Sequence, residues 1–464
     1  MPPGSLLRFA TAGSVDDGKS TLVGRLLHDA KVILADQLEA VARTSADRGF
    51  GGGAGQIDLA LLTDGLRAER EQGITIDVAY RYFSTDRRSF VLADCPGHVQ
   101  YTKNTVTGAS TADAVVVLVD ARHGVVEQTR RHMAVAALLR VMHVVVVVNK
   151  IDLVDYSQAC FDQISAEISA VAKALGIQRL TLVPVSALEG DNVVEASAHT
   201  PWYAGEGYDG RPLLRILEEL PTVDESGLGG DRAFRFPVQW VIRPQGGVAP
   251  GVDVAATRDY RSYAGHIASG TVSVGDRVTV LPTGKTTTVV GIDVAGTAPV
   301  VGGAFPGEQL ETAAAPRSVA LRLADDLDVA RGDLIAGVFP DPPEPVQTFT
   351  AQLIWLGAQP LRTGARVLLK HGTATVQAMV TQIQGRVDLG TMNLAEADTV
   401  ELNDISTVTV RTASPLPVDT YSTLRRTGAF LLMDPQSGNT LAAGLVGEHD
   451  AASTPDNKRI GSVE

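Results

Sequence analysis

The first half of the chain alternates short apolar runs with longer segments in which apolar residues recur every three or four positions. The short runs predict β-strands, and the periodic segments predict helices. We expect strands at residues 6–12, 89–93, 114–120, 141–148 and 180–185, and helices at 19–30, 127–139, 157–175 and 212–220. Strands that alternate with helices of this length favour a mostly parallel sheet covered by helices on both faces.

The pattern changes beyond Pro221, where short β-branched runs are separated by glycine turns. This sequence pattern is typical of a small antiparallel barrel. We expect strands at 233–241, 263–269, 276–281, 286–293 and 318–323. A proline-rich break at 339–347 precedes a second strand-rich stretch that ends near Val446. We therefore expect an α/β nucleotide domain over 1–222, β-barrels over 232–340 and 346–447, and a flexible polar tail over 448–464.

A phosphate-binding pattern, G-x-x-x-x-G-K-[ST], lies between the first predicted strand and the first predicted helix. Its glycines let the backbone wrap tightly, so that N–H groups point at phosphate oxygens. Lys19 would reach the β- and γ-phosphates, and the Ser20 hydroxyl would bind Mg²⁺. The phosphate-binding candidates are Gly13, Ser14, Val15, Asp16, Asp17, Gly18, Lys19, Ser20 and Thr21. A second G-K-T, at 284–286, lacks the upstream glycine and predicts a hairpin turn.

Three further residues add metal and catalytic candidates. A D-x-x-G pattern closes the second strand, where Asp94 would hold Mg²⁺ through water and the Gly97 N–H would bind the γ-phosphate. Thr75 is a third candidate Mg²⁺ ligand, and residues 31–73 would form a switch that senses the γ-phosphate. His98 directly follows the pattern and is the candidate for positioning the attacking water, although a lone histidine is more often structural.

The sequence N-K-I-D at the end of a hydrophobic strand identifies the base. The Asp152 carboxylate can accept hydrogen bonds from both N1–H and the exocyclic amine of guanine, a donor pair that adenine lacks. The segment S186AL188 follows the next strand and adds a backbone N–H for the guanine O6 atom. The guanine-binding candidates are Asn149, Lys150, Asp152, Ser186, Ala187 and Leu188. The expected nucleotide is therefore GTP.

Charge and composition narrow the class of partner. The 464-residue chain carries a formal net charge of −13, which argues against an extended basic surface for nucleic acid. Two cysteines are too few for a disulfide framework and favour a reducing compartment. The sequence shows neither a signal peptide nor an apolar stretch long enough to span a membrane. We expect a cytoplasmic protein without nucleic-acid or membrane partners.

The ordered motifs and the two trailing β-domains resemble the translation-factor GTPases. This resemblance implies an α/β P-loop GTPase domain with a mostly parallel sheet, followed by two antiparallel β-barrel domains. Residues 64–122, 14–29 and 263–276 more closely resemble the GTPase subunit of bacterial ATP sulfurylase. In that family the large subunit hydrolyses GTP with Mg²⁺, and a small adenylyltransferase subunit makes adenylyl sulfate and pyrophosphate from ATP and sulfate. By position, His98 matches the histidine that orients the hydrolytic water.

Two other functions stay open at this point. A translation factor that delivers aminoacyl-tRNA would share the motifs, but its phosphate-backbone contacts need clustered lysine and arginine. Elongation factors also typically have histidine where this chain has Ser14 and Asp17. A regulatory GTPase without coupled catalysis would show hydrolysis that ignores ATP and sulfate.

Overall fold

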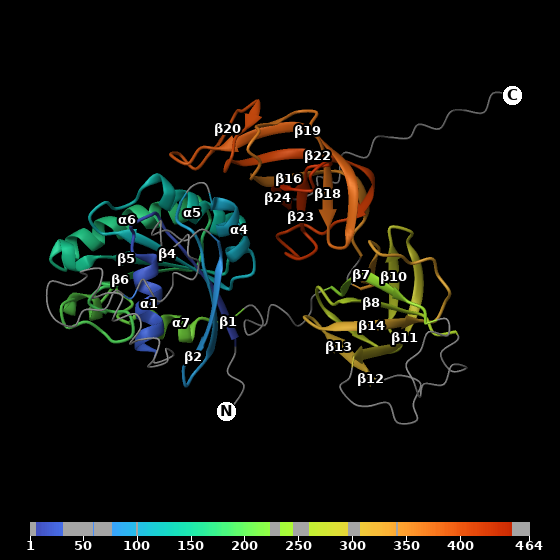
Figure 1. Cartoon of the computed structure of the whole chain (residues 1–464), viewed down its shortest axis with the longest axis horizontal. Coiled ribbons are helices and arrows are strands. Elements are labelled where there is room, and N and C mark those ends of the chain that lie inside the picture. The colour runs from blue at the N-terminus through green and yellow to red at the C-terminus, as the bar shows by residue number, and fades with distance from the viewer. Residues whose placement is uncertain are drawn as a thin grey trace. The chain divides into compact units, whose positions relative to one another are not determined.

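The computed structural model describes residues 6–30, 59, 77–98, 101–222, 233–244, 259–295, 307–339 and 342–447 (Figure 1). The chain divides into two compact units, of which the first holds residues 1–227 and 388–393 and the second holds the remainder. Thr75, the expected switch at 31–73 and the expected tail at 448–464 lie outside the described residues. The expected domain boundaries stay predictions.

The first unit contains a six-stranded sheet in the order β2-β3-β1-β4-β5-β6. Only β2 runs antiparallel, against β3, so the sheet is mostly parallel, as predicted. Every residue of β4 and β5 is buried, because both faces of these valine-rich strands are covered. The strands are β1 (Leu6–Ala12), β2 (Ala79–Ser84), β3 (Ser89–Asp94), β4 (Ala114–Asp120), β5 (His143–Asn149) and β6 (Leu180–Pro184).

Helices follow most of these strands. They are α1 (Lys19–Asp29), α4 (Thr102–Ser110), α5 (Glu127–Leu138), α6 (Gln158–Ala174) and α7 (Leu213–Glu219), with short 3₁₀ helices η3 (Ile151–Val154) and η4 (Pro201–Ala204). The four helices predicted from the sequence end within one residue of the expected bounds. Neither β2 nor α4 was predicted. Helix α4 is rich in threonine and contains Gly108, residues that favour helices poorly, so its packing against the sheet must stabilise it.

The second unit begins with an antiparallel barrel. Six strands form a ring in the order β10-β15-β7-β8-β14-β11, which the pairing of β10 with β11 closes around an apolar core. The turn between β10 and β11 contains Gly284, so the G-K-T at 284–286 belongs to a hairpin, as predicted. The strands are β7 (Arg235–Ile242), β8 (Ser262–His266), β9 (Thr271–Ser273), β10 (Arg277–Leu281), β11 (Lys285–Ala295), β12 (Gly307–Leu310), β13 (Thr312–Ala314), β14 (Ser318–Leu323) and β15 (Leu334–Gly337).

A second ring, β18-β23-β24-β16-β22-β19, closes in the same way through the pairing of β18 with β19. A buried ion pair inside this unit joins Arg235 of β7 to Asp419, with Nη2 and Oδ1 3.0 Å apart. The remaining strands are β16 (Pro345–Trp355), β17 (Leu361–Arg362), β18 (Arg366–His371), β19 (Ala374–Val387), β20 (Leu394–Ala395), β21 (Thr399–Val400), β22 (Ile405–Pro417), β23 (Ala429–Met433) and β24 (Thr440–Val446).

Candidate functional site

The phosphate-binding pattern forms the loop between β1 and α1. Gly18 caps α1 with φ of 89°, and a Cβ atom there would lie 2.4 Å from Nδ2 of Asn149, so only glycine fits. Val15 and Asp16 are exposed at the loop. Asp17 is buried, and its Oδ2 accepts a hydrogen bond of 2.6 Å from the Ser14 N–H. Burial raises the pKa of the Asp17 carboxyl. Its hydrogen bond to the Ser14 N–H stabilises the conformation of the loop.

Lys19 is the buried cation of the site. Its Nζ donates hydrogen bonds to the carbonyl oxygens of Gly13 (2.8 Å) and Ser14 (2.7 Å). Burial lowers the pKa of Lys19, while the nearby carboxylates of Asp17 and Asp94 oppose this shift. A Cβ atom at Gly97 would lie 2.2 Å from Nζ. The fold therefore places the D-x-x-G glycine against the lysine, with a buried positive charge suited to phosphate oxygens.

Asp94 closes β3 beside the loop, and its Oδ1 accepts a 2.7 Å hydrogen bond from the Thr11 hydroxyl. Ser20 and Thr21 lie in the first turn of α1. The side-chain oxygens of Ser20 and Asp94 are hard ligands of the kind that Mg²⁺ prefers, so the donor set fits this ion. The neighbouring Cys95 thiol is fully buried, and burial raises its pKa far above the ordinary value, which agrees with a packing role.

His98 is exposed and begins the connection from the D-x-x-G loop toward α4. The centroid of its ring lies 6.1 Å from that of Tyr101, and its carbonyl accepts a 2.9 Å hydrogen bond from the Tyr101 N–H. An exposed imidazole one residue beyond Gly97 stands at the edge of the phosphate site. This is where a water-positioning group is needed.

The guanine-side motif is more closely tied to the phosphate loop than its sequence suggests. Asn149 is buried, its Nδ2 donates to the Asp17 carbonyl (2.7 Å), and its Oδ1 accepts from the Ala187 N–H (3.0 Å). The Asn149 amide therefore connects three loops: its own, the phosphate loop at Asp17 and the loop at Ala187. Within the described chain, the Leu188 N–H is left as a donor without a hydrogen-bond partner. Ser186 is buried and its hydroxyl accepts from the Glu189 N–H, so it shapes this segment.

Asp152 lies in η3 and is half-buried. Its carboxylate makes no hydrogen bond or ion pair to any other described residue, which leaves both oxygens available to a base. The Lys150 side chain instead donates to the Asp16 carbonyl and to Asp120, so its stem crosses the phosphate loop. Lys150 and Asn149 therefore hold the loops together, whereas Asp152 has no such contact among the described residues.

Asp120 is a further candidate site residue, which lies outside the predicted motifs. It closes β4 with its side chain buried, and it accepts hydrogen bonds from Lys150 Nζ (2.9 Å) and Arg122 Nη2 (2.6 Å). Burial alone would raise the pKa of Asp120, but these two cations outweigh it and hold the pKa well below the ordinary value. The sequence did contain a signal for Asp120, because an aspartate ends a buried apolar strand. In open α/β sheets, ligands bind at the carboxyl ends of the strands.

Replacing Asp120 by asparagine is expected to weaken GDP and GTP binding by about 10- to 100-fold, since Lys150 loses a charge-assisted bond worth ~1.5–3 kcal/mol. Titration with a fluorescent GDP derivative measures this effect. Asp155→Asn provides the control, because Asp155 is exposed and adopts a positive φ that asparagine tolerates. Equal affinity of Asp120→Asn and the unaltered chain would show that the contact with Lys150 does not organise the site.

A buried histidine on α5 lies near the same lysine. Burial is the main cause that lowers the pKa of His132 to about 3, and the charges of Lys19 and Arg131 lower it further. Its Nδ1 has no hydrogen-bond partner among the described residues, and its Nε2 lies 3.2 Å from Gln128 Nε2. His132 is therefore neutral in the folded protein at neutral pH.

This neutral state makes stability depend on pH. Below the ordinary histidine pKa of about 6.5 the unfolded chain takes up a proton at His132 that the folded chain does not, so stability falls with decreasing pH. Between pH 6 and 4, His132→Gln is expected to lose about 1.4 kcal/mol less per pH unit than the unaltered chain. Urea unfolding at several pH values tests this, and parallel pH profiles for the two proteins would refute it.

Comparisons with known proteins agree with these motifs. Residues 5–222 match the elongation factor Tu GTP binding domain, and residues 348–447 match the GTP-eEF1A C-terminal domain-like family. The chain is 48% identical to the bifunctional enzyme CysN/CysC of Mycobacterium tuberculosis, over 98% of this chain and 69% of that protein. It is 45% identical to sulfate adenylyltransferase subunit 1 of Teredinibacter turnerae, over 95% of this chain and 87% of that protein.

A solved structure of Sup35 complexed with GDP covers 96% of this chain and 94% of its own, at 22% identity and a TM-score of 0.40. No helix among the described residues is long and apolar enough to cross a membrane.

Proposed function

This chain belongs to the sulfate adenylyltransferase subunit 1 family, with a GTP-binding domain of the elongation factor Tu type, and we propose that it drives sulfate activation by hydrolysing GTP. The observation that carries the proposal is 45% identity to subunit 1 over nearly the whole chain, together with a phosphate and guanine site assembled from four motifs. A translation factor that delivers aminoacyl-tRNA is not adopted, because relatives with 45% identity over 95% of this chain are sulfate adenylyltransferase subunits.

In this proposal the loop from Gly13 to Thr21 wraps the phosphates, and Lys19 neutralises charge on the β- and γ-oxygens. Ser20, Asp94 and Thr75 would hold Mg²⁺, which when bound supplies further neutralisation of phosphate charge. The Gly97 N–H would fix the γ-phosphate, and His98 would hold the attacking water in line with it. Each of these groups acts by orientation and electrostatics, the main sources of catalysis in phosphoryl transfer.

Guanine selection is assigned to the carboxylate of Asp152, which makes no hydrogen bond to another described residue, and to the Leu188 N–H, which would donate to O6. Asn149, Lys150 and Asp120 would act indirectly, because their hydrogen bonds hold the phosphate loop against the guanine loops. A nucleotide bound across these loops would therefore stiffen the whole edge of the sheet.

The proposed partner is the small adenylyltransferase subunit, which would form adenylyl sulfate and pyrophosphate from ATP and sulfate. That reaction is strongly uphill, so a second hydrolysis is needed to pull it forward. Coupling requires that the partner and the γ-phosphate favour the same conformation of this chain. Each would then raise the affinity of this chain for the other by the same factor. The nucleotides involved are cytoplasmic metabolites, so we place the assembly in the cytoplasm.

Growth on sulfate tests the proposed role in a cell. A bacterium that lacks subunit 1 should grow on cysteine but not on sulfate, and expression of this chain with the small subunit should restore growth on sulfate. The Lys19→Ala variant should fail to restore it. Failure of the unaltered pair to restore growth, with both proteins expressed, would contradict the proposed function.

A further inference from the structure

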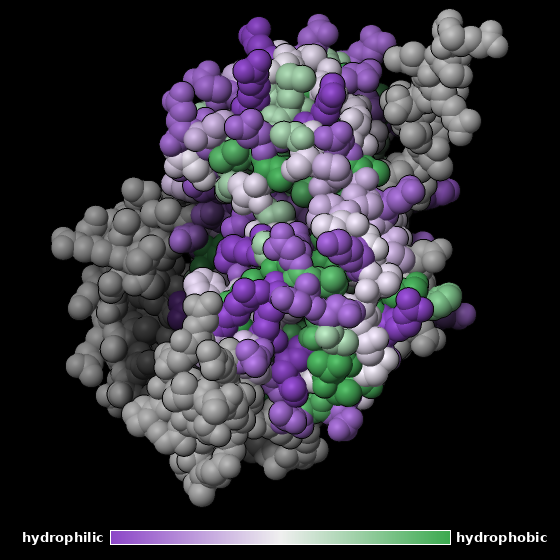
Figure 2. Space-filling model, turned by 90° about the vertical axis from the view of Figure 1, so that its right-hand side faces the viewer, coloured by the Kyte–Doolittle hydropathy of each residue, from purple (hydrophilic) through white to green (hydrophobic). Residues whose placement is uncertain are grey.

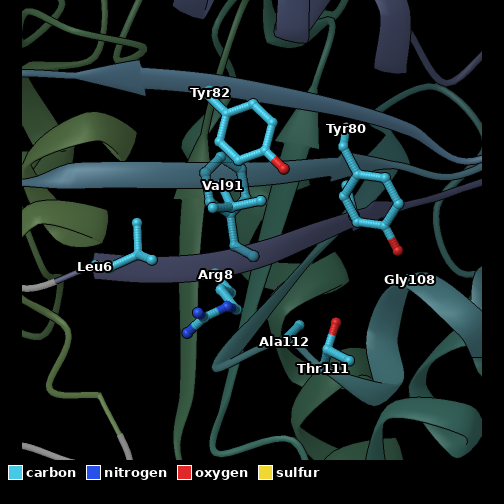
Figure 3. Close-up of a pocket in the computed structure, with 10 residues that line it drawn as sticks. Leu6, Arg8, Tyr80, Tyr82, Val91, Gly108, Thr111 and Ala112 are labelled. Atoms are coloured by element: carbon cyan, nitrogen blue, oxygen red, sulfur yellow. The ribbon is translucent and has the colours of Figure 1, made fainter. Parts of the chain in front are cut away.

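An apolar cavity of about 360 Å³ opens where β1, β2 and β3 meet the end of α4. Its lining includes Leu6, Arg8, Tyr80, Tyr82, Val91 and Thr111. Figure 3 shows the two tyrosine side chains along β2, Leu6 and Arg8 on β1, and Thr111 at the far wall. We call this feature the β2 groove.

The β2 groove exposes large side chains that a monomer normally buries. Tyr82 is 72% exposed, Tyr80 is 47% exposed and Leu6 is 38% exposed, and all three line the same cavity. Adjacent exposed apolar side chains mark interaction sites. Figure 2 shows one face of the molecule, on which hydrophobic and hydrophilic residues are interspersed. The two tyrosines and Leu6 therefore present exposed ring and aliphatic surface around one cavity.

One unpaired cation lies within this apolar surface. The Arg8 side chain is exposed, and it makes no hydrogen bond or ion pair to any other residue in the described part of the chain. Its backbone is engaged instead: the Arg8 N–H donates to Asp113 Oδ2 (2.9 Å), and the Arg8 carbonyl accepts from the Asp113 N–H (2.7 Å). Arg8 lines the same cavity as the two tyrosines, although Val91 of β3 lies between Arg8 and Tyr82 in the sheet. A guanidinium in such a cavity is suited to a carboxylate that arrives together with an apolar side chain.

The walls of the β2 groove are attached to the candidate γ-phosphate loop. The first residue of β2, Ala79, pairs with Asp94. On the other wall, a Cβ atom at Gly108 of α4 would lie 2.5 Å from Sγ of Cys95, and the Thr105 hydroxyl donates a 3.3 Å hydrogen bond to the Pro96 carbonyl. A movement of residues 94–98 would therefore move α4 and change the width of the groove.

From these contacts we propose that the β2 groove is the docking site for the adenylyltransferase subunit. The bound element presents an aromatic or aliphatic side chain between the two tyrosines, next to an aspartate or glutamate that pairs with Arg8. This inference rests on the proposed function, since the family name, subunit 1, is what implies a partner. Docking here links the partner to the phosphate site without any contact to the nucleotide.

A charge-reversed groove variant tests the proposal on the full chain. Arg8→Glu combined with Tyr82→Ser is expected to weaken binding of the purified adenylyltransferase subunit at least about 30-fold, the size of a central interface hot spot. The control combines Arg362→Glu with Trp240→Ser, which makes the same charge change and also removes an exposed aromatic ring. The control should bind the partner within about threefold of the unaltered chain. GDP affinity and melting temperature should be unchanged in both.

A photoreactive side chain gives a second readout that does not depend on the folding of the double variant. Tyr82→benzoylphenylalanine should crosslink to the adenylyltransferase subunit, because Tyr82 is the more exposed of the two tyrosines in the groove. A crosslink to a second copy of this chain would overturn the proposal and assign the groove to self-association. Unchanged partner affinity of the double variant would overturn it as well. If the unaltered chain does not bind the subunit, the proposed function itself fails, and this inference fails with it.

Discussion

The His98→Ala protein is expected to bind GTP as tightly as the unaltered chain and to hydrolyse it about 10²- to 10⁴-fold more slowly. The side chain is exposed at the edge of the phosphate loop, so its loss should not disturb the packing that holds Lys19 and Gly97 together. What is lost is the group that orients the attacking water. Single-turnover hydrolysis with excess protein measures this step directly, because product release does not limit the rate.

Two comparisons make the His98 result specific. His28→Ala, on the last turn of α1, should leave hydrolysis unchanged. His98→Gln keeps hydrogen bonding to water without the possibility of positive charge, so it should recover part of the rate if orientation is the main role. Unchanged turnover of His98→Ala would remove His98 from the mechanism, and a parallel loss of GTP binding would indicate a structural role.

The second large effect is expected on recognition of the guanine base. Asp152→Asn should lower GTP affinity by about 10²- to 10³-fold, because a buried pair of hydrogen bonds to guanine N1–H and the exocyclic amine is replaced by an unfavourable donor contact. Xanthine carries a carbonyl where guanine carries that amine, so the asparagine amide can donate to it. The variant should therefore bind xanthosine triphosphate better than GTP. Competition between the two nucleotides for a fluorescent analogue measures the switch.

Asp155→Asn is the matched control for this switch, since it makes the same chemical change on an exposed residue of the same loop. It should keep the preference for GTP. A loss of all nucleotide binding by Asp152→Asn, without gain for xanthosine triphosphate, would indicate that Asp152 holds the loop in place. In the structure its carboxylate has no hydrogen-bond partner among the described residues, which favours direct contact with the base.

The sequence predicted those parts of the site whose chemistry is local. The pattern from Gly13 to Thr21 follows β1 and opens α1, as expected, because glycine spacing and helix start are encoded within a few residues. The buried valine strands β4 and β5 were found for a similar reason: a continuous apolar run is itself the signal. The barrel strands were found in part, and the short strands β9, β12 and β13 carry too few residues to show a pattern.

Features that depend on distant partners were not predictable in this way. Asp120 is defined by Lys150, 30 residues further along the chain, and by Arg122. Asn149 stays a predicted guanine contact, and the structure adds that its amide holds Asp17 and Ala187 together. Helix α4 has a weak helical pattern, and its close contact at Gly108 with Cys95 exists only in the folded sheet. In each case tertiary packing decides the role of the residue.

The most direct test of the central claim is GTP turnover by this chain together with the adenylyltransferase subunit, with and without ATP and sulfate, while adenylyl sulfate is measured in parallel. The account predicts that GTP cleavage rises only when both ATP and sulfate are present, and that adenylyl sulfate accumulates beyond the equilibrium reached without GTP. Turnover that ignores ATP and sulfate, with adenylyl sulfate unchanged by GTP, would contradict the coupling of GTP hydrolysis to sulfate activation.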